Sequence, residues 1–224
     1  QTMQAASRLE YSAVDVATFS SSILRFAPDK NQRLVASAFL TAIIAAGKGS
    51  DYSLILNQAD GDFPFLCHEN TKNVTITGDV DDIGEGMEGG TITVHGWGGH
   101  VGQTMADGRI IIEGDCDGIG NQMRGGEVIV RGSVRRGHKT SGSYCGIGFD
   151  TSGGKITIEG DCENCQNVSG GDITIGGDVI DVGMRNNGAI IRIKGSVKGK
   201  IGPWMWDGEI HIGGDMPKTI KEFG

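Results

Sequence analysis

Residues 74–126 read VTITGDVDDIGEGMEGG, TITVHGWGGHVGQTMADG and RIIIEGDCDGIGNQMRGG, three consecutive copies of one pattern. Each copy has alternating apolar residues, then a glycine that is usually followed by aspartate, then a glycine-rich turn. The pattern continues to Met216, and a sequence period of about 20 residues is typical of a solenoid, in which each repeat buries its apolar face by stacking on its neighbours. The glycine that closes each strand is Gly78, Gly96, Gly114, Gly132, Gly160, Gly177, Gly195 or Gly214.

Aligning the repeats on this glycine predicts which side chains face inward. The residues two and four positions before it, such as Ile76 and Val74, are β-branched and apolar in every copy, whereas the residue directly before it is polar in most copies. Such alternation predicts a strand with one face in the core. Because parallel crossovers are overwhelmingly right-handed, we predict an all-β fold, a right-handed parallel β-helix of about eight coils.

Other columns of the alignment refine this prediction. Met87, Met105 and Met123 occupy one position in successive coils and are expected at a buried corner, where a flexible thioether packs well. The outward residues Glu113, Arg131 and Glu159 alternate in charge and predict ion pairs between stacked coils.

The sequence before the repeat has a helical period. Apolar residues three and four positions apart predict one helix over residues 14–26 and a second one after Pro28, with Val35, Phe39, Ile43 and Ala46 along its apolar side. Residues 52–56 resemble a short strand. We therefore divide the chain into a helical N-terminal appendage, residues 1–60, and a β-helix domain, residues 61–224. The appendage has too little apolar material to fold alone, so it should pack on the repeats or on a partner.

Composition narrows the functional classes. The net charge of −8, with no cluster of Lys and Arg, argues against nucleic acid as a partner. The longest apolar run, residues 34–47, is too short to span a bilayer, so no membrane association is expected. Five scattered cysteines do not form a disulfide framework and favour a reducing, cytoplasmic location.

Several motifs that suggest chemistry have simpler explanations. Cys162 and Cys165 form a C-x-x-C motif, but they fall in columns that hold Val and Ile in other coils, which predicts core cysteines. The recurring Gly-Asp dipeptide is better explained by aspartates that accept backbone hydrogen bonds than by calcium sites. The histidines, including His100, show no ligand spacing along the chain. The sequence thus predicts no catalytic, cofactor-binding or metal-binding residues.

Two departures from the period are candidate partner interfaces. The coil between Gly132 and Gly160 has about 10 extra residues, within 135–150, and an insertion in a solenoid often carries a binding surface. No G-x-S-x-G motif accompanies its serines, so a nucleophilic hydrolase is disfavoured. Tryptophans near the C-terminal end suggest a cap or an interface. The predicted interface residues are Arg135, Arg136, His138, Tyr144, Phe149, Trp204 and Trp206.

The segments IGEGMEGGTITVHG, VGQTMADGRIIIEG and IGNQMRGGEVIVRG resemble the family named for its G-x-G-x-G repeats. Its members include the repeat-bearing subunit of formylmethanofuran dehydrogenase, the related subunit of the formyltransferase/hydrolase complex, and the C-terminal domain of the glutamate synthase large subunit. The resemblance covers residues 74–216 and leaves the N-terminal residues uncovered.

This resemblance implies a non-catalytic structural subunit that binds and braces the catalytic subunits of a larger enzyme of one-carbon metabolism and holds no cofactor itself. A second expectation is a subunit of a split glutamate synthase that helps to channel ammonia between partner subunits. A third is a free-standing esterase or other hydrolase, because some relatives have carried that label.

Overall fold

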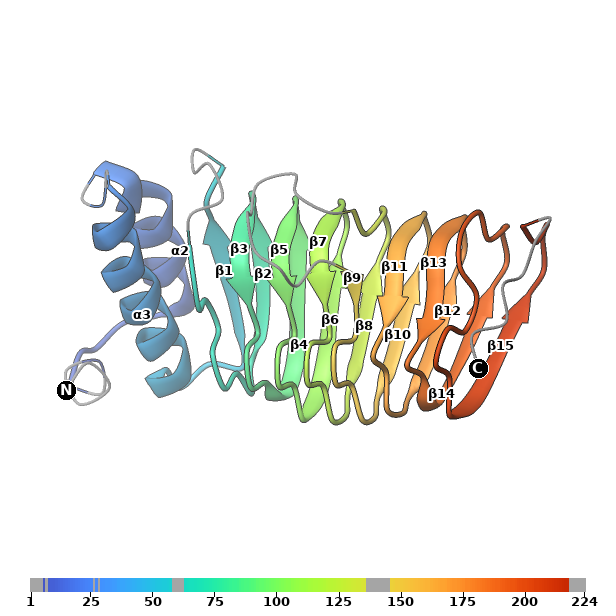
Figure 1. Ribbon diagram of the computed structural model, residues 1–224. Coiled ribbons are helices and arrows are strands. Elements are labelled where there is room, and N and C mark those ends of the chain that lie inside the picture. The colour runs from blue at the N-terminus through green and yellow to red at the C-terminus, as the bar shows by residue number, and fades with distance from the viewer. Residues whose placement is uncertain are drawn as a thin grey trace.

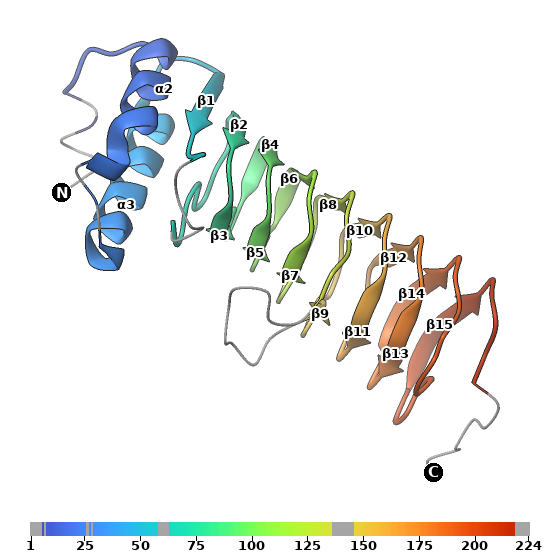
Figure 2. The same ribbon diagram turned by 90° about the horizontal axis from the view of Figure 1, so that it is seen from above.

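The strands of successive coils stack into two sheets in the computed structural model, which describes residues 6, 8–25, 27, 29–57, 63–135 and 146–217 (Figures 1 and 2). Within these residues the neighbouring strands of both sheets are parallel, which confirms the predicted β-helix of about eight turns. The first sheet contains, in order, β1 (Asp51–Ile55), β2 (Asn73–Thr77), β4 (Glu88–His95), β6 (Asp107–Ile112), β8 (Glu127–Val130), β10 (Lys155–Ile158), β12 (Asp172–Ile175), β14 (Asn187–Ile193) and β15 (Asp207–Ile212). The second sheet contains, from the N-terminal end, β3 (Val80–Ile83), β5 (Gly98–Val101), β7 (Cys116–Ile119), β9 (Gly146–Ile147), β11 (Cys162–Gln166) and β13 (Val179–Met184).

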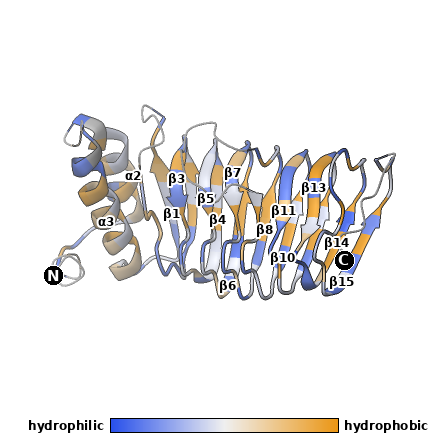
Figure 3. Ribbon diagram, viewed as in Figure 1, coloured by the Kyte–Doolittle hydropathy of each residue, from blue (hydrophilic) through white to orange (hydrophobic). Residues whose placement is uncertain are grey.

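The core lies between the two sheets and follows the predicted columns. Val74 pairs with Ile92, which pairs in turn with Ile110, and all three side chains are buried. Apolar residues therefore recur along each strand from coil to coil (Figure 3). In the last coil Ile210 and Ile212 are only half-buried, because no further coil in the described part of the chain covers them.

The aspartates of the Gly-Asp dipeptides link one coil to the next. The Oδ1 atom of Asp115 accepts a hydrogen bond from the backbone N–H of Ser133 at 2.7 Å, and Ser133 Oγ accepts one from Asp161 N–H at 3.1 Å. Asp161 and Asp178 continue this ladder to the following coils. The side chains thus accept backbone hydrogen bonds as predicted, and the donor lies one coil further along the chain.

Two other packing predictions can be compared with the structure. Met87, Met105 and Met123 are fully buried, as predicted. Arg131 forms an ion pair with Glu159 as expected. A second ladder was not anticipated: Glu127 accepts from Arg109 at 2.9 Å and from Lys155 at 3.0 Å.

Two helices cover the N-terminal end of the solenoid (Figure 1). Helix α2 (Ala13–Ser22) continues into a short 3-10 turn, η1 (Ile23–Arg25), and helix α3 (Lys30–Ala46) follows. Each α-helix begins with a capping box, Ser12 with Asp15 and Asp29 with Gln32. Their buried apolar side chains join the core of the first coils, so the helices close this end of the solenoid.

Polar side chains of the helices satisfy backbone groups at this end. Ser20 Oγ accepts a hydrogen bond from Ile55 N–H at 2.9 Å, and Thr41 Oγ1 accepts one from Cys67 N–H at 3.0 Å. Ser37 Oγ donates to the carbonyl oxygen of Pro64 at 2.6 Å. The helices therefore cap the exposed end of the solenoid by hydrogen bonding as well as by packing.

The helical segment differs from its sequence prediction in detail. Val35, placed on the apolar side of α3, is 70% exposed, while the adjoining face buries Ser37 and Leu40. Strand β1 falls within residues 1–60 and pairs in register with β2, so the first sheet begins inside that segment. Neither helix, over the residues described, has the length and apolar content needed to cross a membrane.

Candidate interaction site on the second sheet

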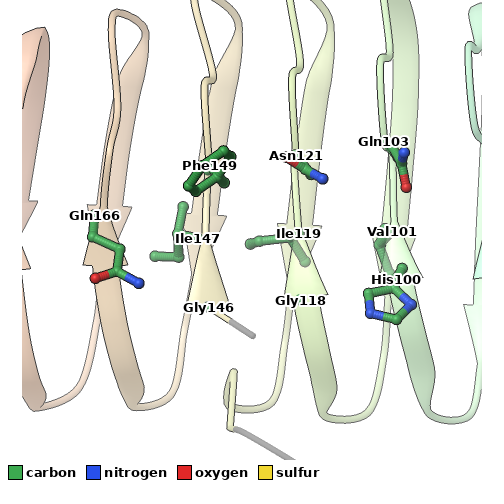
Figure 4. Close-up of a pocket in the computed structure, with 11 residues that line it drawn as sticks. His100, Val101, Gln103, Gly118, Ile119, Asn121, Gly146, Ile147, Phe149 and Gln166 are labelled. Atoms are coloured by element: carbon green, nitrogen blue, oxygen red, sulfur yellow. The ribbon is translucent and has the colours of Figure 1, made fainter. Parts of the chain in front are cut away.

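The outward column of the second sheet contains two glycines in succession. Asp82 pairs with His100, His100 with Gly118, and Gly118 with Gly146. Since glycine has no side chain, the surface is recessed between His100 and Gln166, which lies at the far side of the recess (Figure 4). We call this recess the glycine hollow.

The walls of the glycine hollow combine amide groups with one aromatic ring. Gln103, Asn121 and Phe149 lie along one side, each just beyond the end of its strand (Figure 4). Ile119 and Ile147 are buried beneath it. The volume is about 100 Å³, well below the 300–1,000 Å³, roughly, of most small-molecule pockets. The hollow is therefore large enough for a single side chain.

Two polar groups give the hollow its hydrogen-bonding character. The side-chain oxygen of Asn121 is buried and accepts no hydrogen bond from the described residues. Gln166, at the opposite side, is half-buried. A buried acceptor without a partner is costly, so the site favours a ligand group that donates a hydrogen bond.

The electrostatic environment at the edge of the hollow is acidic. His100 Nδ1 lies 2.9 Å from Asp82 Oδ1, and this hydrogen bond, aided by the negative charges of Asp82, Asp81 and Asp117, raises the pKa of His100 although burial opposes the rise. Asp117 itself is buried and accepts a hydrogen bond from Trp97 Nε1 at 3.2 Å. The surface next to the hollow thus favours positively charged groups.

The ligand atoms of Asp81, Asp82 and His100 lie within 4.8 Å of one another. They come from adjacent strands, β3 and β5, so their proximity depends on the register between coils and not on spacing along the chain. Carboxylate and imidazole groups are suitable cation ligands, but the hydrogen bond between His100 and Asp82 already accounts for their approach.

The predicted interface residues do not form one surface. Phe149, 39% exposed, lines the glycine hollow. Arg135, at the start of the stretch 135–150, forms an ion pair with Asp161 at 3.4 Å. Trp204 and Trp206 lie several coils away beside β15, and the guanidinium of Arg185 is 5.7 Å from the Trp204 ring centre. Arg136, His138 and Tyr144 are outside the described residues.

The other polar residues of the hollow were missed. His100, Gln103, Asn121 and Gln166 are inconspicuous in the sequence, because no motif joins them. The available signal was the pair of glycines in one outward column, Gly118 in the coil before the long one and Gly146 within the long coil. That alignment requires knowing where the insertion begins and ends.

The buried cysteines are core residues, as predicted. Cys162 and Cys165 are almost completely inaccessible, and Val134 bridges Cys116 and Cys162, which are therefore not on adjacent strands. Burial raises the pKa of Cys165 to about 12 and raises the pKa of Cys162 as well. A thiol that stays protonated is a poor nucleophile and a poor metal ligand, so these residues pack as small apolar groups.

Comparison with known proteins gives no assignment, because no protein-family model matches the chain and no curated protein matches it either.

Proposed function

We propose that this chain is a non-catalytic scaffold subunit of a multi-subunit enzyme complex, similar to the repeat-bearing subunit of formylmethanofuran dehydrogenase. In this role it binds and braces catalytic subunits in the cytoplasm and needs no cofactor of its own. The observation that supports the proposal best is the glycine hollow, which lies on a rigid sheet next to the insertion.

The composition of the hollow suits a protein partner. Aromatic rings are enriched at interface cores, and amide groups supply hydrogen bonds there. Phe149 offers such a ring, and the buried oxygen of Asn121 can accept a hydrogen bond from a side chain that enters. The carboxylates of Asp81 and Asp82 beside His100 favour a basic or amide-bearing side chain on the partner.

The solenoid supplies the rigidity that a scaffold requires. Hydrogen bonds and buried columns connect each coil to the next along the described length, so Phe149 and His100 keep a fixed separation. A partner surface that matches this spacing loses little conformational entropy on binding.

The test is native purification of the chain with its partners, followed by mass spectrometry of the co-purified proteins. We expect catalytic subunits of the amidohydrolase-like or molybdopterin-dependent kind, and we expect Phe149→Ala to lower their recovery. The control is Ile180→Ala, because Ile180 is also exposed, at 49%, on the second sheet but lies outside the hollow.

Other outcomes point to the other expectations. Co-purification with an amidotransferase or a flavin protein would favour the glutamate synthase arrangement and ammonia channelling. Esterase turnover by the isolated chain, lost when Ser143, one of the serines within 135–150, is changed to Ala, would overturn the scaffold proposal in favour of a hydrolase.

A further inference from the structure

The two ends of the solenoid differ in how their last strands are covered in the described part of the chain. At the N-terminal end, Ser20 and Thr41 accept hydrogen bonds from backbone N–H groups of the first coils. At the C-terminal end, β15 is the last strand of the first sheet among the described residues, and Ile210 is only half-buried. Trp206 beside it is 73% exposed.

The open edge of β15 presents backbone groups in a regular pattern. Gly213 N–H donates to the Ile193 carbonyl at 2.8 Å and therefore points toward β14. Because the backbone groups of a strand alternate in direction, the N–H and C=O groups of Ile210 and Ile212 point away from β14. An edge of this kind is a template for pairing with another strand.

The chain that follows β15 leads away from this edge. Val197 N–H donates to the carbonyl of Asp215 at 2.9 Å, so residues 214–217 lie along the end of the second sheet. The described part of the C-terminal segment thus caps the other sheet and leaves β15 open.

We propose that β15 pairs antiparallel with β15 of a second copy of this chain, about a twofold axis at Ile210. In this register the outward backbone groups of Ile210 bond to those of Ile210 in the second copy. Glu209 then faces His211 of the second copy, and the reciprocal pair forms by symmetry. The first sheet would continue from one molecule into the other.

Charge selects this register over its neighbours. Only shifts by an even number of residues keep the outward backbone groups opposite one another, and the nearest such registers are shifted by two. One such shift places Glu209 opposite Glu209, and the other places His211 opposite His211. A carboxylate opposite an imidazole can form a hydrogen bond or, when the imidazole is protonated, an ion pair, whereas two facing carboxylates repel each other. Within one chain His211 Nε2 and Glu209 Oε2 lie 2.7 Å apart, and both side chains are exposed, so the pairs across the axis would extend or exchange this contact.

A second copy also fits the apolar side of the strand. Ile210 and Ile212 point toward the core but lack a covering coil among the described residues. An antiparallel copy places Ile210 against Ile210, which continues the buried column across the axis. A closed twofold pairing uses each edge once and therefore stops at the dimer.

The test measures self-association of the full chain by sedimentation across a concentration series. We expect the wild-type chain to dimerise and Glu209→Lys to weaken dimerisation by roughly tenfold, because the change affects both symmetry-related pairs. The double variant Glu209→Lys/His211→Glu restores opposite charges across the axis and should restore the dimer. Glu113→Lys, the same charge change at an exposed mid-solenoid residue, should leave it unchanged.

Hydrogen exchange supplies a second readout on the same samples. The amides of Ile210 and Ile212 should be protected in the dimer and unprotected in Glu209→Lys, whose circular dichroism should match the wild type. A chain that stays monomeric at all concentrations would overturn the proposal. A dimer that leaves the Ile210 amide unprotected, or a monomer in which residues 218–224 protect it, would overturn it too. None of these outcomes depends on whether catalytic subunits bind the glycine hollow.

Discussion

His100 shows how a single residue acquires its properties from the neighbouring coil. Its imidazole is half-buried and hydrogen-bonded to Asp82, which lies one coil earlier. The hydrogen bond, together with the negative charges around it, raises the pKa of His100. This interaction therefore stabilises the fold below the ordinary pKa of histidine, and the stabilisation is lost as the pH rises through the raised value.

Asp82→Asn should accordingly lower the pKa of His100, because a neutral amide no longer favours the imidazolium. The measurement is an NMR titration of the His100 ring, with Glu113→Gln as a control for the loss of a remote carboxylate. Stability of the Asp82→Asn variant should also depend less on pH near the histidine titration. An unchanged midpoint would show that the neighbouring aspartates, and not this hydrogen bond, set the pKa.

The core residues could be predicted from the sequence, while those of the hollow could not. Cys162 and Cys165 were assigned correctly because other coils place Val or Ile at the same inward positions. The hollow depends on outward residues, which differ from coil to coil and carry no shared pattern. Asn121 and Gln166 come together only through the register across the long coil.

At the scale of the repeat element, glycines serve two distinct purposes. A Cβ atom at Gly96 would collide with the carbonyl oxygen of Gly78 in the coil below. At Gly89, within β4, a Cβ would meet nothing within 4 Å. The sequence presents both as glycines of the same repeat, and only the stacking distance distinguishes them.

Gly96→Ala should therefore destabilise the chain by about 1–3 kcal/mol, since the backbone must shift to relieve the collision. Gly89→Ala should be neutral or stabilising by up to about 1 kcal/mol, because it restricts the unfolded chain. Denaturant unfolding followed by circular dichroism compares the two. Equal destabilisation of both variants would mean that chain flexibility, and not close stacking, explains the glycines.

For the whole molecule, the coils form a linear array in which each contacts mainly its neighbours. Stability in such an array is approximately a sum of repeat and interface contributions, so the ends open first unless they are capped. Here one end has a helical cap that hydrogen-bonds to the sheet, and β15 at the other end has no covering element among the described residues. The molecule should therefore unfold directionally.

We expect the amides of β14 and β15 to exchange at a lower opening free energy than those of β1 and β2. The comparison is best made by hydrogen exchange in Glu209→Lys, in which the proposed dimer cannot mask fraying of the C-terminal coils.

A second variant, Ser20→Ala in the same Glu209→Lys background, removes the acceptor of Ile55 N–H. It should lower the free energy of unfolding by about 1 kcal/mol, with faster exchange confined to the first coils. Ser21→Ala is the matched control, because its hydroxyl is exposed and donates to the carbonyl oxygen of Thr18 within α2. Uniform exchange along the solenoid would instead indicate that all coils unfold as one unit, and the helices would then have no role in setting the direction of unfolding.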